Sequence, residues 1–236
     1  MRNAFSLRQQ GMWRLFDLLC ACAGLLVLSP VMALVALGIV VSDGRPVLFR
    51  QIRVGRYGKP FRIWKFRTMQ SGAVGSAITA AGDARVTRFG ARLRQFKLDE
   101  LPQLINVIYG EMSLVGPRPE APEYVNRELP IWQAVLLVRP GITDLATLLY
   151  RNEEALLGSS GDAEKHYRET VLPSKLILNL KYLCARSFAQ DIRLILLTIR
   201  YSLTPSRFDP EHIGEIFDIG KEHVGSTYSL SSAVNR

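Results

Sequence analysis

Cysteine and histidine are scarce in this sequence, with three of each among 236 residues. Cys20, Cys22 and Cys184 have neither a metal-ligand spacing nor the even number that a disulfide framework needs. We interpret them as small apolar packing residues. The three histidines all follow residue 165, far from the densest motifs of the chain. Acid–base or nucleophilic chemistry near residues 97–120 would therefore have to use carboxylates.

Several familiar site motifs are missing as well. The sequence contains no P-loop, no dinucleotide fingerprint, no Ser/His/Asp arrangement and no nucleic-acid motif. Acidic residues are scarce in the first 70 positions, which hold 11 of the 30 Lys and Arg but 2 of the 21 Asp and Glu. The whole formal excess of +9 therefore lies beside the longest apolar run. This combination indicates an anionic cytoplasmic membrane face as a partner more than nucleic acid.

The longest apolar run, LLCACAGLLVLSPVMALVALGIVV at 18–41, has 24 residues without a charge. At about 1.5 Å per residue, a helix of this length would reach about 36 Å and could cross a hydrocarbon core of about 30 Å. Ser29-Pro30 predicts a kink or a break in its middle, because proline lacks a backbone donor and crowds the Leu26 carbonyl. The Ser29 hydroxyl could bond to a carbonyl freed in this way.

Both flanks of this run are basic, which bears on its topology. A spanning helix would move one basic flank across the membrane, whereas a re-entrant hairpin keeps both flanks on the cytoplasmic side. The residues alone leave these two arrangements equally open. A cleaved signal peptide is a third interpretation, but the run is long for one and the sequence after it is densely basic. The basic residues on the two flanks are Arg2, Arg8 and Arg14 before the run, and Arg45, Arg50, Arg53, Arg56 and Lys59 after it.

The rest of the sequence predicts an α+β protein with a small β-hairpin and a mainly helical cytoplasmic domain. The residues predict a membrane-associated segment at 1–44, a folded domain at 45–205 and a partly disordered C-terminal extension at 206–236. The resemblance described below makes the first of these a re-entrant helix and the second a catalytic domain with interfacial helices. The expected elements are a hairpin at 46–69, a Gly-rich mobile loop at 71–83, helices at 85–96, 101–109 and 122–137, a turn at 138–146, and amphipathic helices at 164–203 broken at Pro173. Pro102 and Gly110 mark the ends of the 101–109 helix. The basic amphipathic helices could lie at a membrane surface, and ordinary core-facing helices are an equal alternative.

The stretch KLDELPQLINVIYGEMSLVGPRPE at 97–120 places Asp99 and Glu100 before a Leu-Pro step. One interpretation is helix capping by the two carboxylates. The other is a carboxylate nucleophile at a positive helix end, where an anionic phosphate could also bind. Adjacent residues on a helix do not share a face, so one carboxylate could attack while the other holds a divalent cation or moves a proton.

Several cations accompany the acidic pair. Arg118 lies between two prolines, which stiffen the loop that presents its guanidinium, and arginine suits bidentate phosphate contact. Lys65 and Arg67 alternate along the second strand of the hairpin and so share a face. Arg92 and Arg94 precede the acidic pair on the expected basic helix. A solvated turn, a solvated strand face and ordinary salt bridges are the alternatives for these residues. Together with the apolar run, the set favours transfer of a phosphoryl-type group to a lipid at a bilayer surface.

Four stretches resemble the bacterial sugar transferase family, the monotopic polyprenyl-phosphate phosphoglycosyl transferases. They are FDLLCACAGLLVLSPVMALVAL, GRPVLFRQIRVGRYGKPFRIWKFRTM, TRFGARLRQFKLDELPQLINVIYGEMSLVGPRPE and VRPGITDLA, and they run in order from about residue 11 to 146. The resemblance implies transfer of a phosphosugar from a UDP-sugar to polyprenyl phosphate, such as undecaprenyl phosphate, with release of UMP. Such an enzyme would start a lipid-linked glycan of the exopolysaccharide or lipopolysaccharide kind.

The resemblance also implies roles for individual residues. Asp99 would attack the β-phosphorus and form an aspartyl phosphosugar. Glu100, with Asp99, would hold Mg²⁺. Arg94 and Arg118 match positions that hold phosphate groups. The remaining matches are expected near phosphate or substrate without a defined role, and they are Lys65, Arg67, Arg139 and Thr143.

The anchor and the partners follow from the same resemblance. Ser29-Pro30 matches the helix break of a re-entrant anchor, which favours the hairpin topology and a place on the cytoplasmic face of the bacterial inner membrane. Membrane lipid is a further expected partner, nucleic acid is not, and a homodimer is left open. The chain resembles the minimal form of the family, without extra N-terminal spanning helices. It reads Asp144 where many members have glycine after Pro-Gly-Ile-Thr, so the sugar donor is left open.

Two alternatives from other classes stay open on the sequence. One is a membrane-anchored basic interaction module without catalysis, in which the acidic pair would only cap a helix. The other is a glycosyl transferase that moves the sugar without its phosphate and releases UDP instead of UMP.

Overall fold

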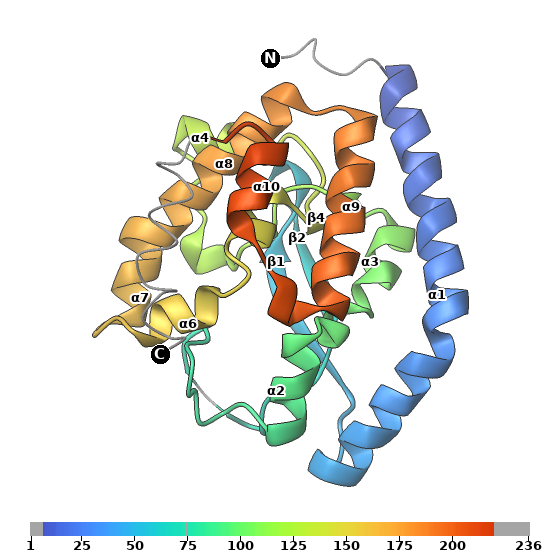
Figure 1. Cartoon of the computed structure of the whole chain (residues 1–236), viewed down its shortest axis with the longest axis vertical. Coiled ribbons are helices and arrows are strands. Elements are labelled where there is room, and N and C mark those ends of the chain that lie inside the picture. The colour runs from blue at the N-terminus through green and yellow to red at the C-terminus, as the bar shows by residue number, and fades with distance from the viewer. Residues whose placement is uncertain (1–6, 74, 220–236) are drawn as a thin grey trace.

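The computed structural model describes residues 7–73 and 75–219. Its helices are α1 (Leu7–Asp43), α2 (Arg88–Gln95), α3 (Gln103–Tyr109), α4 (Pro130–Val135), α5 (Leu145–Leu149), α6 (Glu153–Gly158), α7 (Ala163–His166), α8 (Leu172–Ala185), α9 (Phe188–Leu203) and α10 (Pro210–Ile216). Its strands are β1 (Leu48–Val54), β2 (Pro60–Phe66), β3 (Ser113–Val115) and β4 (Gly141–Thr143). Figure 1 shows α1 along one side of the molecule, with the strands in the middle of the remaining helices. This mixture of helices and small sheets agrees with the predicted α+β class.

The strands form two separate two-stranded sheets. β1 and β2 pair antiparallel, with Leu48 opposite Phe66, and this confirms the predicted hairpin. Tyr57, in the tight connection, has a positive φ of 58°. β3 and β4 pair parallel, with Ser113 opposite Gly141. The prediction of a turn over 138–146 is therefore wrong for β4, because three residues are too few to show a strand periodicity.

Helix α1 continues through Pro30. Ser29 Oγ donates to the Leu26 carbonyl at 2.8 Å, so the hydroxyl meets the carbonyl that proline crowds, as predicted. The distortion therefore lies within one helix, and Figure 1 shows the lower part of α1 slanting inward beneath the other elements. By length and composition, Gly11–Asp43 could cross a membrane. The re-entrant topology stays a prediction.

Two small clusters of buried side chains attach α1 to the rest of the protein. Ala21 packs with side chains of β2 and α3, and Val35 and Ile39 pack with side chains of β2 and α2. A much larger apolar core joins α4, α5, α8, α9 and α10. Gly90 permits the close approach of α2 to the end of β2, because a Cβ there would lie 2.2 Å from the carbonyl oxygen of Thr68. This approach brings α2 to the edge of the site described below.

Several helix predictions need correction. The helix expected at 122–137 is a 3-10 turn at Pro122–Tyr124 followed by the six residues of α4. The amphipathic region does not break at Pro173, because Val171 is helical (φ −71°, ψ −50°) and proline fits the first turn of α8. A π-helical turn, Tyr167–Val171, precedes α8 instead. The helices separate at Arg186, whose ψ of 129° ends α8.

The boundaries of the three predicted regions stay predictions. The described part of the C-terminal region 206–236 contains α10, whose Ile213 is fully buried against the large core. Residues 220–236, which the sequence predicted to be partly disordered, lie outside the described residues.

Candidate active site

The acidic pair lies in a 3-10 turn, Leu98–Glu100, between α2 and α3. Lys97 starts the turn in a left-handed conformation (φ 57°, ψ 21°), which redirects the chain after α2. Asp99 and Glu100 are buried, at 6% and 8% exposure. The residue that precedes α3 is Pro102, and no side-chain capping bond is formed there within the described chain. The capping interpretation of the acidic pair therefore does not describe this geometry.

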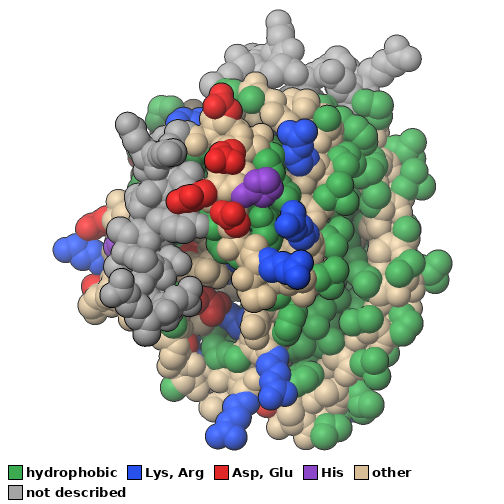
Figure 2. All heavy atoms as spheres, in the orientation of Figure 1, with side chains coloured by type: hydrophobic (Ala, Val, Ile, Leu, Met, Phe, Trp, Pro, Cys, Tyr) green, Lys and Arg blue, Asp and Glu red, His purple; other side chains and the backbone are tan. Residues whose placement is uncertain are grey.

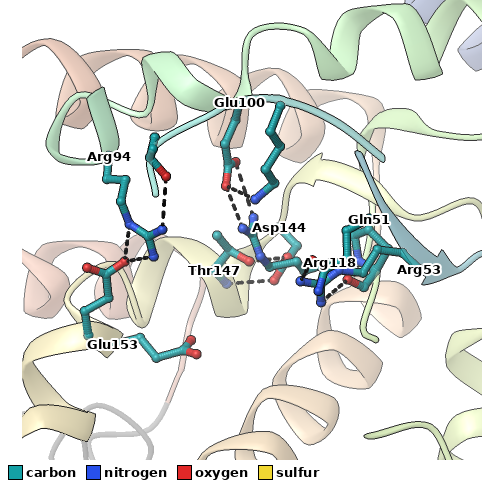
Figure 3. A network of polar contacts seen from close by, with 12 residues as sticks. Gln51, Arg53, Arg94, Glu100, Arg118, Asp144, Thr147 and Glu153 are labelled. Atoms are coloured by element: carbon teal, nitrogen blue, oxygen red, sulfur yellow. Dashed lines mark hydrogen bonds and ion pairs between the residues drawn. The ribbon is translucent and has the colours of Figure 1, made fainter. Parts of the chain in front are cut away.

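Glu100 is held by two cations. Arg118 Nη2 lies 2.6 Å from Glu100 Oε1 and its Nη1 lies 3.3 Å from Oε2. Lys65 Nζ, which comes from β2, donates to Oε1 at 3.2 Å. Figure 3 shows Arg118 reaching up to Glu100 from the loop that follows β3. Proline on each side of Arg118 restricts the backbone of that loop.

Asp99 differs from Glu100 in its hydrogen-bond partners. Its Oδ1 is buried and has no hydrogen-bond partner in the part of the chain that the structure describes. A buried carboxylate oxygen without a partner costs free energy, so it marks a place where a ligand could bind or react. The two adjacent carboxylates therefore differ in their hydrogen-bond partners, although both line the same cavity.

The electrostatic environment separates the two carboxyl groups further. Burial raises the pKa of Asp99 above its usual range, and the charge of Glu100 raises it more. Burial would also raise the pKa of Glu100, but Arg118 and Lys65 hold it well below its usual range. Burial lowers the pKa of Lys65 to about 8, and Glu100 offsets only part of this effect. Such divergent pKa values for neighbouring acids are typical of active sites.

The acidic pair opens onto a cavity of about 620 Å³. Its walls come from β1, β2, the loop after β2, α2, the 3-10 turn at Leu98–Glu100, the Arg118 loop and the region from α5 to α8. Cationic side chains in these walls include Arg53, Lys65, Arg94, Lys97 and Arg118. A cavity of this size with many cations fits an anionic small molecule better than an apolar one.

Arg94 also faces this cavity, but it is engaged. Its guanidinium donates to Glu154 of α6, with Nε 2.9 Å from Oε1, and lies 3.4 Å from the Thr68 hydroxyl. Figure 3 shows Arg94 at the edge of the network, apart from Glu100. Because Glu154 is 45% exposed, an anion of higher charge could displace it from Arg94.

Lys65 belongs to β2, whereas Arg67, predicted on the same strand, comes directly after its last residue, Phe66. Both line the cavity, but they have different partners. Arg67 Nη2 donates to the carbonyls of Asp43 and Gly44, at 2.6 and 2.7 Å, and another nitrogen donates to Ser71. Arg67 therefore ties the end of α1 to the hairpin, whereas Lys65 faces the acidic pair.

The structure does not bring two of the predicted binding residues to the cavity. Arg139 Nε donates to the Gly110 carbonyl at 3.0 Å, and Thr143 Oγ1 lies 2.7 Å from the Thr198 hydroxyl. Neither is among the described residues that line the cavity. Both belong to the segment around β4, which pairs with β3, so packing turns their side chains away from Asp99.

A second charged network lies deeper in the cavity, and the sequence analysis missed it. Lys175 of α8 is 3% exposed and donates to Glu153 at 2.8 Å, with Glu120 3.8 Å away. Arg53 lies 3.7 Å from the other oxygen of Glu120. Burial lowers the pKa of Lys175, but the charges of Glu153 and Glu120 raise it overall. The available signal was Lys175 on the same helical face as the apolar Leu172 and Leu178, three residues before and after it.

A divalent cation fits the acidic pair only in part. Among residues 7–73 and 75–219, no group of three or more His, Cys, Asp or Glu is placed to hold a metal ion. Mg²⁺, however, is commonly held by one or two carboxylates, with substrate phosphates and water completing its octahedron. The free Oδ1 of Asp99 and the carboxylate of Glu100 offer such a pair.

Comparison with known proteins places this site in a family context. A family model described as Bacterial sugar transferase matches residues 8–205. The UDP-glucose:undecaprenyl-phosphate glucose-1-phosphate transferases of Escherichia coli and Caulobacter vibrioides are 37% and 36% identical to the chain, over 78% and 81% of its length. A UDP-N-acetylgalactosamine-undecaprenyl-phosphate N-acetylgalactosaminephosphotransferase of Aeromonas hydrophila is 37% identical over 80% of the chain. The matches cover 38%, 69% and 43% of these three proteins, in the order given, so the chain spans about two fifths of the length of two of them.

Proposed function

This chain belongs to the bacterial sugar transferase family, and from that premise we propose that it is a phosphoglycosyl transferase. It transfers a sugar 1-phosphate from a UDP-sugar to polyprenyl phosphate and releases UMP. The printed names of the relatives support the two substrate classes, since they pair UDP-glucose or UDP-N-acetylgalactosamine with undecaprenyl phosphate. The reaction begins a lipid-linked glycan.

One observation supports this proposal most directly. Asp99 has a buried carboxylate oxygen without a partner, beside a neighbour that two cations hold in place. A nucleophile needs this kind of freedom, and a diphosphate needs the surrounding positive charge.

In the first step, an Asp99 oxygen attacks the β-phosphorus of the UDP-sugar. The bond between this phosphorus and the bridging oxygen breaks, and UMP leaves with the electron pair. The sugar phosphate is then attached to Asp99 as an acyl phosphate. The raised pKa of Asp99 favours a more basic carboxylate, while Arg118 and Lys65 lie where the negative charge of the diphosphate would bind.

In the second step, a phosphate oxygen of polyprenyl phosphate attacks the same phosphorus. The bond to Asp99 breaks, the carboxylate is restored, and the product is a polyprenyl diphosphate sugar. Arg94 supports both steps if phosphate replaces Glu154 as its partner. Mg²⁺, when bound by Asp99 and Glu100, would supply charge neutralisation for the diphosphate.

We place this reaction at a membrane surface. α1 exposes Leu19, Leu26, Val27, Leu34 and Val41, and α9 exposes Leu196, Ile199 and Leu203. Figure 2 shows apolar side chains gathered over the side where α1 and α9 lie, with Lys and Arg beside them. A contiguous exposed apolar surface of this kind suits a bilayer. We propose that α1 enters as a re-entrant helix from the cytoplasmic face and that α9 lies at the interface.

The test is product analysis with purified protein. UDP-glucose and UDP-N-acetylgalactosamine are each incubated with the protein and Mg²⁺, without lipid, and the released nucleotide is identified. The proposal expects UMP and a stoichiometric sugar-phosphate adduct on Asp99 by mass spectrometry. Undecaprenyl phosphate should then discharge the adduct, and a chelator should suppress the reaction.

Other products separate the alternatives. Release of UDP would indicate transfer of the sugar without its phosphate. Full turnover by Asp99→Asn, or full turnover in chelator, would contradict the assigned chemistry. An absence of any turnover, together with salt-sensitive binding to anionic vesicles, would favour the interaction module.

A further inference from the structure

A second hollow lies outside the catalytic cavity, between α1 and α2. It has a volume of about 370 Å³ and is here called the α1–α2 groove. Its lining residues are Val31, Leu34, Val35, Gly38, Phe89, Arg92, Leu93, Phe96 and Leu98. Among these described residues, Arg92 alone carries a charge. The groove is therefore an apolar surface with one cation on it.

The two helices meet closely at one point of this groove. A Cβ on Gly38 would lie 2.5 Å from Cζ of Phe89, so the ring rests against α1 in space that a larger residue at position 38 would occupy. Val35 and Leu93 are buried beside this contact, whereas Leu34 is 68% and Phe96 39% exposed. The groove consequently has a closed floor and an open, apolar rim.

The chain between α2 and α3 forms the wall shared by the groove and the catalytic cavity. Phe96 and Leu98 face the groove, whereas Lys97 and Asp99 face the cavity. On α2 the same division separates Arg92 from Arg94, two residues apart. Successive residues of this segment thus line the apolar groove and the polar cavity in turn, and only this one segment separates the two.

This arrangement fits a ligand that is apolar along its length and anionic at one end. An apolar chain in the groove places its anionic head near Arg92, across the shared wall from Lys97 and Asp99. An ordinary phospholipid would gain the same apolar contact, but it carries no group that must reach Asp99. The position of the groove against the wall of the catalytic cavity therefore favours the acceptor lipid, whose phosphate must reach Asp99, over bulk lipid.

We propose that the α1–α2 groove binds the isoprenoid chain of polyprenyl phosphate next to its phosphate, with Arg92 steering that phosphate around Phe96 toward Asp99. This inference rests on the proposed function, because it assigns a place to the second substrate of that reaction. The groove takes no part in the first step, in which the UDP-sugar releases UMP. The two steps can therefore be tested separately.

The first experiment uses a matched pair of tryptophan variants on α1. Leu34 lines the groove and Leu37 does not, although Leu37 lies on the same helix and is 59% exposed. Leu34→Trp should raise the KM for undecaprenyl phosphate by about fivefold, a loss of about 1 kcal/mol. Release of UMP without lipid should stay within about twofold of wild type, because that step does not use the groove. Leu37→Trp should change neither the KM for undecaprenyl phosphate nor the lipid-free release of UMP by more than about twofold.

A second matched pair tests the cation. Arg92→Gln should raise the KM for undecaprenyl phosphate, whereas Arg88→Gln removes an exposed charge from the same helix and should leave this KM unchanged. A photoreactive residue at position 34, in vesicles of phosphatidylglycerol and phosphatidylethanolamine, should crosslink to labelled undecaprenyl phosphate. Unlabelled undecaprenyl phosphate should compete for this crosslink, and added phosphatidylglycerol should not.

The outcomes separate this inference from the function on which it rests. If the wild type forms the Asp99 adduct but Leu34→Trp and Leu37→Trp behave alike, the groove assignment is wrong and the proposed function stands. Equal competition by phosphatidylglycerol would make the groove a site for bulk lipid and would also overturn the assignment. If the wild type releases no UMP from either donor, the proposed function fails and the assignment fails with it.

Discussion

Arg118 grips Glu100 through both oxygens of its carboxylate, at 2.6 and 3.3 Å, from a loop 18 residues further along the chain. Lys65 adds a third contact at 3.2 Å. These contacts keep Glu100 ionised and fixed, whereas the adjacent Asp99 retains a buried oxygen without a partner among the described residues. Asp99 and Glu100 are both carboxylates, but their surroundings suit Asp99 to attack and Glu100 to remain fixed.

Replacing the proposed nucleophile should affect activity and stability in opposite directions. Asp99→Asn should reduce kcat by about a thousandfold or more, because an amide is a poor nucleophile. It should also increase the free energy of unfolding at pH 7. Burial raises the folded-state pKa of Asp99, so its ionised form weakens the fold above that pKa and the neutral amide removes this cost. Thermal unfolding at pH 7 measures the second effect, and a lower melting temperature for Asp99→Asn would contradict it.

Lysine should not replace the bidentate contact of Arg118 with Glu100. Arg118→Lys keeps the charge but cannot contact both Glu100 oxygens, and we expect kcat/KM to fall by about tenfold to a hundredfold. Arg127→Lys is the matched control, because Arg127 binds the Gly58 carbonyl outside the cavity. Steady-state UMP release gives both values. Equal activity of the two variants would show that the charge of Arg118 suffices.

The deeper network around Lys175 should contribute to stability. Lys175→Met leaves Glu153 and Glu120 without their shared cation, and breaking a buried pair in this way costs about 3–5 kcal/mol. The exposed Lys165→Met serves as control and should change the free energy of unfolding by less than about 0.5 kcal/mol. Urea unfolding measures both variants. A small effect for Lys175→Met would mean that Arg53 alone satisfies Glu120.

The loop after β2 should loosen in acid. The bond to Arg85 lowers the pKa of Asp83, and Arg85 also holds the carbonyls of Ser76 and Ile78. Burial would raise the pKa of Glu164, but its hydrogen bonds, including one with Ser76, lower it overall. A carboxyl group whose pKa is lower in the folded than in the unfolded protein stabilises the fold fully at pH values above its unfolded-state pKa of about 4. This contribution disappears as the pH falls through the folded-state pKa.

Limited proteolysis at several pH values tests this loosening. Cleavage between residues 75 and 79 should be slow at pH 7 and should accelerate below about pH 4. Asp83→Asn should show the faster cleavage already at pH 7, whereas Glu128→Gln, which alters an exposed glutamate, should follow the wild type. A cleavage rate in Asp83→Asn equal to wild type would show that Asp83 does not hold the loop.

The re-entrant topology predicts that both flanks of α1 lie on one side of the membrane. In a variant with Cys20, Cys22 and Cys184 replaced by alanine, a single cysteine is introduced as Gln10→Cys or as Lys59→Cys. An impermeant thiol reagent added to sealed inverted vesicles should label both variants equally. Labelling of one variant before detergent and of the other only after it would show that α1 spans the bilayer.

Much of the local structure could be predicted because short stretches specify it. The hairpin at 46–69, the helix before Gly110 and the bond from Ser29 to the Leu26 carbonyl follow from residue type and spacing. The strand β4 could not be predicted, since three residues carry no periodicity and their partners in β3 lie 28 residues earlier. The π-helical turn before α8 was not predicted. The break expected at Pro173 came from the rule that proline interrupts a helix, and this rule considers α-helical hydrogen bonds alone.

The sequence by itself determined which chemistry the protein carries: an acidic pair, a proline-flanked arginine, a basic N-terminal third and an apolar helix with proline inside. Only the tertiary structure decided how these groups are used. It gave Arg118 to Glu100, left an oxygen of Asp99 free, paired Arg94 with Glu154 sixty residues away and turned Arg139 and Thr143 elsewhere. Side-chain spacing is fixed locally by backbone geometry, but partners across the chain depend on how helices and strands pack, and no local pattern records that packing.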